Sequence, residues 1–204
     1  PHSSELRSII ELQLYLSIVI TSVMVVGIVS GQRDRLYKEL QLKHDHDLLT
    51  GVYTRPCFSR LFNSEVQRLL RYDTQFCLIL FDIDYFKKVN DNLGHQAGDE
   101  VLKAVCLVIN EELRDIDSLI RWGGEEFLIL LPNTMLDGAH QFAERCREKI
   151  EQHDFHINQQ VTISLGIAQF RKGMTMKDML KKVDDTMYIS KQNGRNQTTI
   201  ADTE

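Results

Sequence analysis

The stretch that decides the fold is Gly123-Gly124-Glu125-Glu126-Phe127, which joins two apolar runs, Leu119–Trp122 and Phe127–Leu131. Two strand-like runs joined by a glycine pair predict a β-hairpin, because glycine adopts the positive φ angles that tight hairpin turns need. The turn also carries two adjacent carboxylates, whose like charges repel each other unless a positive charge lies nearby. A divalent metal ion is the obvious source of that charge, so the hairpin is a predicted metal site.

A second acidic pair follows the apolar run Phe76–Ile83, which is predicted to be a buried strand. Asp82 and Asp84 lie at its end, on one face if the strand continues that far. Taken alone, such acids are more often solvated turn residues. Together with the hairpin acids they predict a cage of three or four carboxylates, as Mg²⁺ chemistry on phosphates requires.

The rest of the domain alternates between helices and strands. Apolar periodicity predicts helices at 56–70, 96–113, 135–151 and 176–192, a strand at 161–170 and an edge strand at 198–201. A hairpin combined with helix-linked strands predicts an α/β (α+β) fold, in which helices cover a sheet. No P-loop and no G-x-G-x-x-G motif occurs, so a nucleotide would not be held in a Walker or Rossmann manner.

Residues 12–29 form an 18-residue run without a charge. As a helix this run would be apolar on all sides and about 27 Å long, close to the thickness of a membrane's hydrocarbon core. We therefore expect a transmembrane helix through 9–30; a buried hydrophobic helix or a dimer contact is the alternative. Basic residues are more numerous after the run than before it, which favours a cytoplasmic C-terminal side.

These patterns divide the chain into three parts. Residues 1–31 hold the transmembrane segment with a short outer flank, 32–47 form a polar helical linker, and 48–204 form the globular domain. The linker has leucines at helical spacing and could pair with a copy of itself. The chain begins at Pro1 without a methionine, which is compatible with its being the tail of a longer protein.

Composition narrows the classes of partner. A formal net charge of -5 argues against nucleic acid as the main partner, since surfaces that bind nucleic acid are usually basic. A nucleotide substrate remains compatible with this charge if metal ions offset the repulsion. The four cysteines are scattered without a C-x-x-C pair, which predicts buried free thiols and neither a disulfide framework nor a zinc site.

Four segments, in this order and spacing, resemble a GGDEF domain of the diguanylate cyclases. They are FDIDYFKKVNDNLGHQAGDEVL (81–102), RWGGEEFLILLP (121–132), VTISLGIA (161–168) and YISKQNGRN (188–196). The resemblance covers roughly 47–200, the whole predicted globular domain. It implies a palm-like nucleotidyl-cyclase sheet and the condensation of two GTP into cyclic di-GMP with release of pyrophosphate.

The resemblance also implies roles for single residues. Positions that match the family's ligands for Mg²⁺, with Mn²⁺ as a substitute, are Asp82, the Ile83 carbonyl, Glu125 and Glu126. Positions that match the family's substrate contacts are Asn90 and Asp99 for guanine, His95 near the nucleotide, and Lys87, Lys191 and Arg195 for the β and γ phosphates. Glu125 and Lys87 would be catalytic, with Glu125 accepting the 3′-hydroxyl proton. Gly123 and Gly124 would let the hairpin backbone approach the nucleotide closely.

Several of these residues also have plain structural interpretations. Asn90 and His95 belong to stretches that suit turns, Asp99 suits a helix cap, and Lys191 with Arg195 suits the charge preference of a helix end. Arg114 and Asp117 could be a surface i,i+3 pair. The resemblance instead implies that Arg114 and Asp117, with Arg145 on the next helix, form an inhibitory site for the cyclic di-GMP product.

The expected protein is a diguanylate cyclase at the inner membrane of a bacterium, with its catalytic domain in the cytoplasm. Two copies must face each other for catalysis, so a homodimer is expected and the linker would transmit the signal. A catalytically silent module that senses GTP or cyclic di-GMP is the alternative, and a related cyclase using ATP is a third. The chain departs from the common family pattern at Glu125 (usually Asp), at Tyr53-Thr54-Arg55-Pro56 (commonly L-x-N-R-R) and at Trp122 (more often Tyr).

Overall fold

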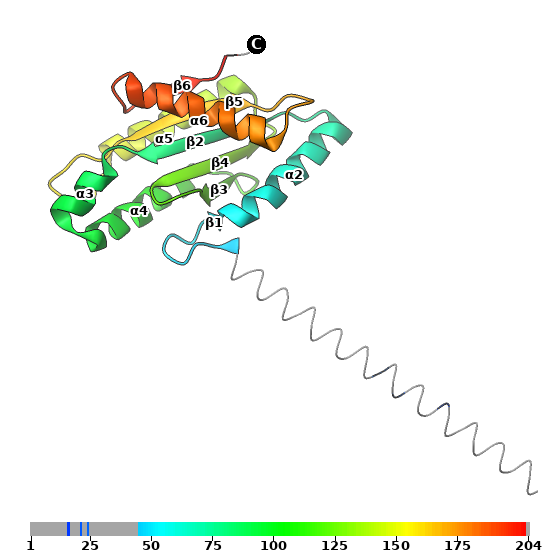
Figure 1. Ribbon diagram of the computed structural model, residues 1–204, viewed down its shortest axis with the longest axis horizontal. Coiled ribbons are helices and arrows are strands. Elements are labelled where there is room, and N and C mark those ends of the chain that lie inside the picture. The colour runs from blue at the N-terminus through cyan, green and yellow to red at the C-terminus, as the bar shows by residue number, and fades with distance from the viewer. Residues whose placement is uncertain (1–15, 17–20, 22–23, 25–44, 203–204) are drawn as a thin grey trace, which may run out of the picture. The chain divides into compact units, whose positions relative to one another are not determined.

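The computed structural model describes residues 45–202 and the single positions 16, 21 and 24. Within 45–202 one sheet has the strand order β1-β3-β4-β2-β5-β6 (Figure 1). Its strands are β1 (Tyr53–Thr54), β2 (Phe76–Ile83), β3 (Ser118–Arg121), β4 (Glu126–Pro132), β5 (Ile163–Gln169) and β6 (Thr198–Ile200). The helices are α2 (Arg55–Tyr72), α3 (Phe86–Leu93), α4 (His95–Asn110), α5 (Leu136–Gln152) and α6 (Met176–Gln192).

The centre of the sheet is antiparallel. Strand β2 pairs with β4 on one side and β5 on the other, and β3 pairs with β4. Only the short edge strands are parallel to their neighbours, β1 to β3 and β6 to β5. Every residue of β2 is buried, because helices cover both faces of the sheet.

Alternate residues of β2 enter two separate hydrophobic cores, as the period of two in a strand requires. Cys77, Ile79 and Phe81 pack in the core that α4 and α5 cover. Leu78 and Leu80 pack in the other core, under α2 and α6. Figure 1 shows α2 and α6 on the near side of the sheet and α4 and α5 behind it. The predicted α/β layer fold is confirmed, and the four cysteines are buried free thiols as predicted.

The elements agree with the sequence predictions except around β1 and α3. The predicted strand 76–83 and helix 176–192 match β2 and α6. The turn predicted around Asn90 was wrong, because that residue lies within α3. Only Phe86 and Val89 of α3 are buried, so the helix leaves little apolar periodicity in the sequence. The two-residue strand β1 was not predicted, because so short a segment carries no alternation.

The hairpin forms as predicted, but its glycines play a different part. Among the described glycines, positive φ angles occur at Gly51, Gly94, Gly173 and Gly194, and not at the hairpin pair. The expectation that the pair supplies positive φ was therefore wrong. The reason is the length of the loop: the paired residues Arg121 and Phe127 leave more than the two central residues of a primed turn between them.

No helix in the described part of the chain is both long and apolar enough to cross a membrane. The predicted transmembrane segment at 12–29 lies outside the described residues except at positions 16, 21 and 24, and residues 32–44 of the predicted linker lie outside them too.

Helix α6 lies directly against β5 at a position without a side chain. A Cβ atom on Gly166 would stand 2.3 Å from the backbone nitrogen of Met187 and 2.4 Å from the carbonyl oxygen of Val183. Backbone cannot yield as the tip of a flexible side chain can, so this contact sets the spacing between α6 and the sheet. The position of α6 bears on the predicted site because its C-terminal end carries Lys191, an expected phosphate contact.

We predict that Gly166→Ala lowers the free energy of unfolding by roughly 3 kcal/mol, because the added methyl group overpacks a helix–sheet contact. Urea denaturation measures the change. The control is Gly138→Ala in α5, where a Cβ would meet only the Thr134 Cγ2 at 3.4 Å. That change should be neutral or stabilise by roughly 0.5 kcal/mol. Equal stabilities for the two variants would contradict the prediction.

Candidate active site

The antiparallel register of β2 and β4 brings the predicted acids together. Phe81 pairs with Phe127, their rings stacked with centroids 5.2 Å apart, and Asp82 then pairs with Glu126. The Ile83 N–H donates to the carbonyl oxygen of Glu125 at 3.3 Å. The two strands therefore end side by side with three carboxylates, on Asp82, Glu125 and Glu126.

One lysine from another element reaches this acidic edge. The Lys191 Nζ, near the end of α6, lies 2.8 Å from the Asp82 Oδ2. Side-chain exposure is 25% for Lys191 and 10% for Asp82, so the ion pair is largely removed from solvent. Lys191 is therefore more than a favourable charge at the end of a helix, because its ammonium forms an ion pair with an acid of the site.

The positive charge of Lys191 does not satisfy the acids. Burial raises the pKa of Asp82 to about 6, the hydrogen bond and charge of Lys191 oppose that rise, and the charges of Glu125 and Glu126 add to it. Burial also raises the pKa of Glu125, again with Lys191 opposing and Glu126 adding. Both carboxyls would be more easily ionised if another cation were present.

The acids do not form the complete metal cage that the sequence predicts. Among the described residues, no three His, Cys, Asp or Glu side chains form a group that could hold a metal ion. The carboxylates of Asp82, Glu125 and Glu126 nevertheless suit a hard cation, because Mg²⁺ prefers oxygen ligands and the site holds more negative than positive groups. Asp82 with Glu125 is thus the pair around which a metal site would be built.

Asp84 was expected to share a face with Asp82 only if the strand continued to residue 84, and that condition is not met. Its side chain is 1% exposed and accepts hydrogen bonds from Ser164 Oγ at 2.6 Å and Thr162 Oγ1 at 2.7 Å. It also accepts the Asn196 N–H at 3.1 Å. The regular alternation stops where β2 ends at Ile83, so Asp84 turns toward these hydroxyl groups, and its role is structural.

The residues expected to contact the nucleotide base lie on α3 and α4. Asn90 packs so closely on Gly98 that a Cβ there would stand 2.0 Å from the Asn90 Oδ1. The next residue, Asp99, is exposed, so the helix pair brings an amide and a carboxylate to neighbouring positions. The alternative that Asp99 caps a helix is wrong, because α4 begins at His95 with Gly94 at its N-cap. His95 and Lys87 are also exposed.

Arg195 lies in the turn that follows α6. Its guanidinium carbon is 4.5 Å from the ring centroid of Tyr85, and its Nη1 donates to the Tyr85 hydroxyl at 3.3 Å. The Lys88 Nζ lies 4.3 Å from the centroid of the same ring. The ring of Tyr85, two residues after the end of β2, thus contacts two cations, and the sequence analysis assigned it no role.

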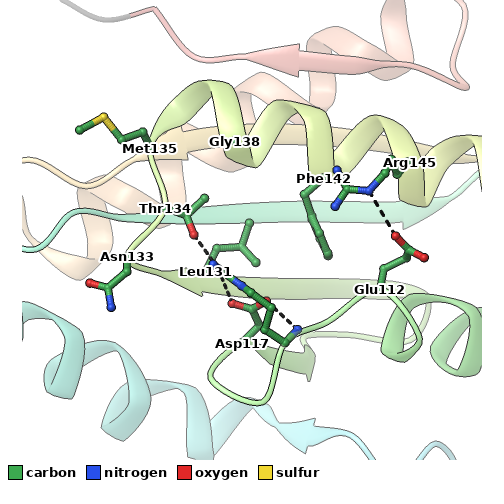
Figure 2. A pocket seen from close by; sticks show the side chains of 10 residues that line it. Glu112, Asp117, Leu131, Asn133, Thr134, Met135, Gly138, Phe142 and Arg145 are labelled. Atoms are coloured by element: carbon green, nitrogen blue, oxygen red, sulfur yellow. Dashed lines mark hydrogen bonds and ion pairs between the residues drawn. The ribbon is translucent and has the colours of Figure 1, made fainter.

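A cavity of about 320 Å³ holds the residues expected to bind product. Arg114 makes a bidentate pair with Asp117, from Nη2 to Oδ1 at 2.8 Å and from Nε to Oδ2 at 3.0 Å. Figure 2 shows Phe142 and Arg145 of α5 on one side of the cavity and Asp117 on the other. Arg145 is held by Glu112 at 3.2 Å. The i,i+3 pair is therefore present, and it is part of a pocket that brings all three predicted residues together.

The cavity and the acidic edge lie at opposite ends of β4. This strand begins at Glu126, beside Asp82, and Leu131 near its other end lines the cavity. Five residues of extended chain span roughly 17 Å. Two sites with different chemistry are therefore joined by one buried strand.

A comparison with known families decides what this arrangement is. The family model described as "Diguanylate cyclase, GGDEF domain" matches residues 44–197. The chain belongs to this family. Its sheet with flanking helices is the palm-like α/β fold of GGDEF domains, which the resemblance implied.

Individual relatives agree with the family match. The diguanylate cyclase DgcM of Escherichia coli K12 is 35% identical over 170 residues, which cover 83% of this chain and 42% of DgcM. The coiled coil and GGDEF domain of DgcB from Caulobacter crescentus, solved in complex with c-di-GMP, has a TM-score of 0.75 at 27% identity, covering 86% of this chain and 97% of that one. The active GGEEF domain of a diguanylate cyclase from Vibrio cholerae has a TM-score of 0.67 at 31% identity, covering 72% and 97%. The chain spans less than half the length of the curated relatives that it matches.

The residues at which this GGDEF domain departs from the common family pattern fit the surrounding structure. Trp122 makes an edge-to-face contact with Phe58, with ring centroids 5.5 Å apart. The guanidinium of Arg55 lies 4.2 Å from the Trp122 ring centroid. Pro56 falls in the first turn of α2, where a missing N–H costs nothing.

Sequence reasoning missed the residue that braces the hairpin of this GGDEF domain. Arg121 Nη2 donates to the Gly124 carbonyl oxygen at 2.8 Å, and its Nη1 donates to the Asp47 Oδ1 at 2.9 Å. Burial raises the pKa of Asp47, but hydrogen bonds from Thr50 and Arg121 outweigh it and lower the pKa below its ordinary value. The sequence signal that could have identified this residue was its charge, because Arg121 is the one charged residue in the otherwise apolar run 119–122.

We predict a coupling energy of roughly 1–2 kcal/mol between Arg121 and Asp47, because the pair is charge-assisted and each side chain is less than one quarter exposed. Urea denaturation of Arg121→Met, Asp47→Asn and the double variant measures it. The exposed pair Lys103–Glu100 is the comparison, with an expected coupling below roughly 0.5 kcal/mol. Equal coupling energies for the two pairs would contradict the prediction.

Proposed function

We propose that this chain is a diguanylate cyclase that condenses two GTP into cyclic di-GMP and two pyrophosphate. The observation that carries the proposal is the intact hairpin, whose Glu125 and Glu126 stand in register beside buried Asp82. A broken hairpin motif would favour a silent domain, and this one keeps both glycines and both acids. The active GGEEF domain from Vibrio cholerae supports the view that Glu at position 125 is compatible with catalysis.

Asp82 and Glu125, with the Ile83 carbonyl and Glu126 as further ligands, would hold Mg²⁺ or Mn²⁺. The chemistry that such an ion would supply is to lower the pKa of the attacking 3′-hydroxyl and to neutralise charge at the α-phosphate. Glu125 would accept the hydroxyl proton. Lys191 now lies on Asp82, and with an ion there its ammonium would be available for the β and γ phosphates, together with Lys87 and Arg195. These cations would hold the β and γ phosphates both in bound GTP and as pyrophosphate departs.

Recognition of the substrate would rest on α3 and α4. Asn90 and Asp99 offer an amide and a carboxylate, which complement the edge of guanine, and His95, the first residue of α4, would lie near the nucleotide. Glycine at position 124 leaves open space, since a Cβ there would meet nothing within 4 Å. At Gly123 a Cβ would stand 2.9 Å from the Glu126 Oε2, so glycine there also leaves room for the acid.

Catalysis would need a homodimer. One domain supplies one GTP, and the 3′-hydroxyl of each must meet the α-phosphorus of the other. The predicted linker 32–47 would align the two domains in response to a signal. A transmembrane helix through 9–30 would anchor the chain in the inner membrane, with the catalytic domain in the bacterial cytoplasm.

The cavity at Arg114 supports product inhibition. Its arginines, Arg114 and Arg145, match the guanine or phosphate contacts that the family resemblance implies for cyclic di-GMP. The same cavity supports the alternative function, a module that binds cyclic di-GMP or GTP as a sensor without turnover. Measurement of turnover separates the two.

We predict that the full chain, purified in detergent, converts GTP and Mg²⁺ to cyclic di-GMP and that Glu125→Gln lowers the rate at least 1,000-fold. The amide keeps the size of the side chain but removes a metal ligand and a proton acceptor. Liquid chromatography with mass spectrometry identifies the product, and parallel reactions with ATP test the nucleotide. Absence of cyclic di-GMP from a demonstrably dimeric wild-type sample would leave the sensor function.

We predict that Arg114→Ala raises the concentration of cyclic di-GMP needed for half-inhibition at least tenfold, because a charged hydrogen-bonding group is lost from the cavity. Progress curves with added cyclic di-GMP measure this. Arg114→Ala also leaves the buried carboxylate of Asp117 without its guanidinium partner, so Arg145→Ala is the gentler companion variant: Arg145 is 53% exposed. Unchanged inhibition in both variants would remove the product-site assignment.

A further inference from the structure

The turn after α6 has an unusual backbone. Gly194, Arg195 and Asn196 have φ angles of 113°, 64° and 46°, so three consecutive residues lie in the left-handed region. Asparagine tolerates this region, whereas arginine seldom adopts it. Such a conformation persists only where the surroundings hold it in place, and it often marks a functional site.

Side chains from α5 hold this turn. The Asn196 Oδ1 accepts a hydrogen bond from the Arg147 Nη1 at 3.0 Å, and the Asn196 Nδ2 donates to the Glu151 Oε1 at 2.8 Å. Arg147 Nη1 in turn donates to the Glu151 Oε2 at 2.8 Å. The three side chains thus form a closed ring of hydrogen bonds, which we call the Asn196 clamp.

A second contact holds the backbone of the same residue. The Asn196 N–H donates to the Asp84 Oδ2 at 3.1 Å, and Asp84 is itself held by Ser164 and Thr162. The backbone of Asn196 is therefore held by Asp84, just after β2, and its side chain is held by α5. The preceding residue, Arg195, has little freedom to change its φ and ψ angles while both contacts hold.

Holding Asn196 in place also fixes where the guanidinium of the preceding residue, Arg195, lies. It lies over the Tyr85 ring, and its Nε stands 4.0 Å from the Asp84 Oδ1. The side chain keeps 36% of its surface exposed, so an anion can still reach it. These contacts hold the cation beside Asp84 and Tyr85, which directly follow β2, the strand that carries Asp82.

We propose that Arg147 and Glu151 are positioning residues for Arg195, acting through Asn196 on the grip of the β and γ phosphates of GTP. The inference rests on the proposed cyclase function, in which Arg195 binds phosphate. An ordinary ion-pair network on one helix explains the i,i+4 contact of Arg147 with Glu151. It does not explain why both side chains also bind a residue 49 and 45 positions away.

The test uses the full chain in detergent with two readouts. These are the Kd of a non-hydrolysable GTP analogue with Mg²⁺, and the kcat and KM for GTP. We expect Arg147→Met and Asn196→Gly to raise Kd and KM about tenfold while kcat stays within about twofold. A misplaced Arg195 would bind the phosphates less tightly in the ground state and in the transition state by the same amount, which raises KM and leaves kcat unchanged. Glycine at 196 adopts the turn without strain but lacks the amide. Asp137→Asn, which removes an exposed charge in the first turn of the same helix, should leave both readouts unchanged.

A double variant separates positioning from general stability. In the Arg195→Ala background, Arg147→Met should produce no further rise in Kd, because the group that it positions is already absent. An additional tenfold rise in that background would overturn the proposal, as would a wild-type Kd in both Arg147→Met and Asn196→Gly. If Arg147→Met loses its circular dichroism signal of folding, Asn196→Gly decides alone.

Failure of the proposed function is distinguishable from failure of the clamp. A wild-type chain that binds the GTP analogue without making cyclic di-GMP contradicts the cyclase assignment, while its Kd values still decide the role of Arg147. A wild-type chain that binds no GTP analogue removes both, since Arg195 would then have no phosphate to hold. Normal turnover with unchanged Kd in the variants removes the clamp alone.

Discussion

The register between β2 and β4 places Asp82 opposite Glu126, and the site depends on this one pairing. Like charges at facing positions of a sheet repel, and burial makes the repulsion harder to screen. The stacked rings of Phe81 and Phe127, one position earlier, hold the register against that cost. Lys191 partly compensates the charge, and the residual excess of carboxylate is what makes this edge suited to a cation.

The same sheet separates two tasks. At one end of β4 lie the hairpin acids, and at the other lies the cavity with Arg114 and Asp117. Helix α5 spans both regions: Arg145 faces the cavity, while Arg147 reaches the turn at Asn196. Rigid elements that are packed on both faces can hold distant groups in fixed positions, which is how a small domain can keep the acidic edge and the cavity apart.

Much of the fold was readable from the sequence because the signals are local. Apolar runs and glycine punctuation predicted the hairpin, the strand 76–83 and the helix 176–192. Helix α3 escaped prediction because only Phe86 and Val89 face the core. The positive φ expected at the hairpin glycines was wrong because loop length, which the tertiary pairing sets, determines the type of turn.

Sequence alone determined which chemical groups the chain carries: the hairpin acids, Asp82, and the basic residues at the end of α6. The number and order of the matching motifs also determined the family. Only the tertiary structure decided how these groups are used. It turned Asp84 inward to structural hydroxyl groups and set Lys191 on Asp82. It also tied Asn196 to a helix far away in the chain. The physical reason is that burial and partner geometry, which act between residues distant in sequence, set the charge and orientation of each side chain.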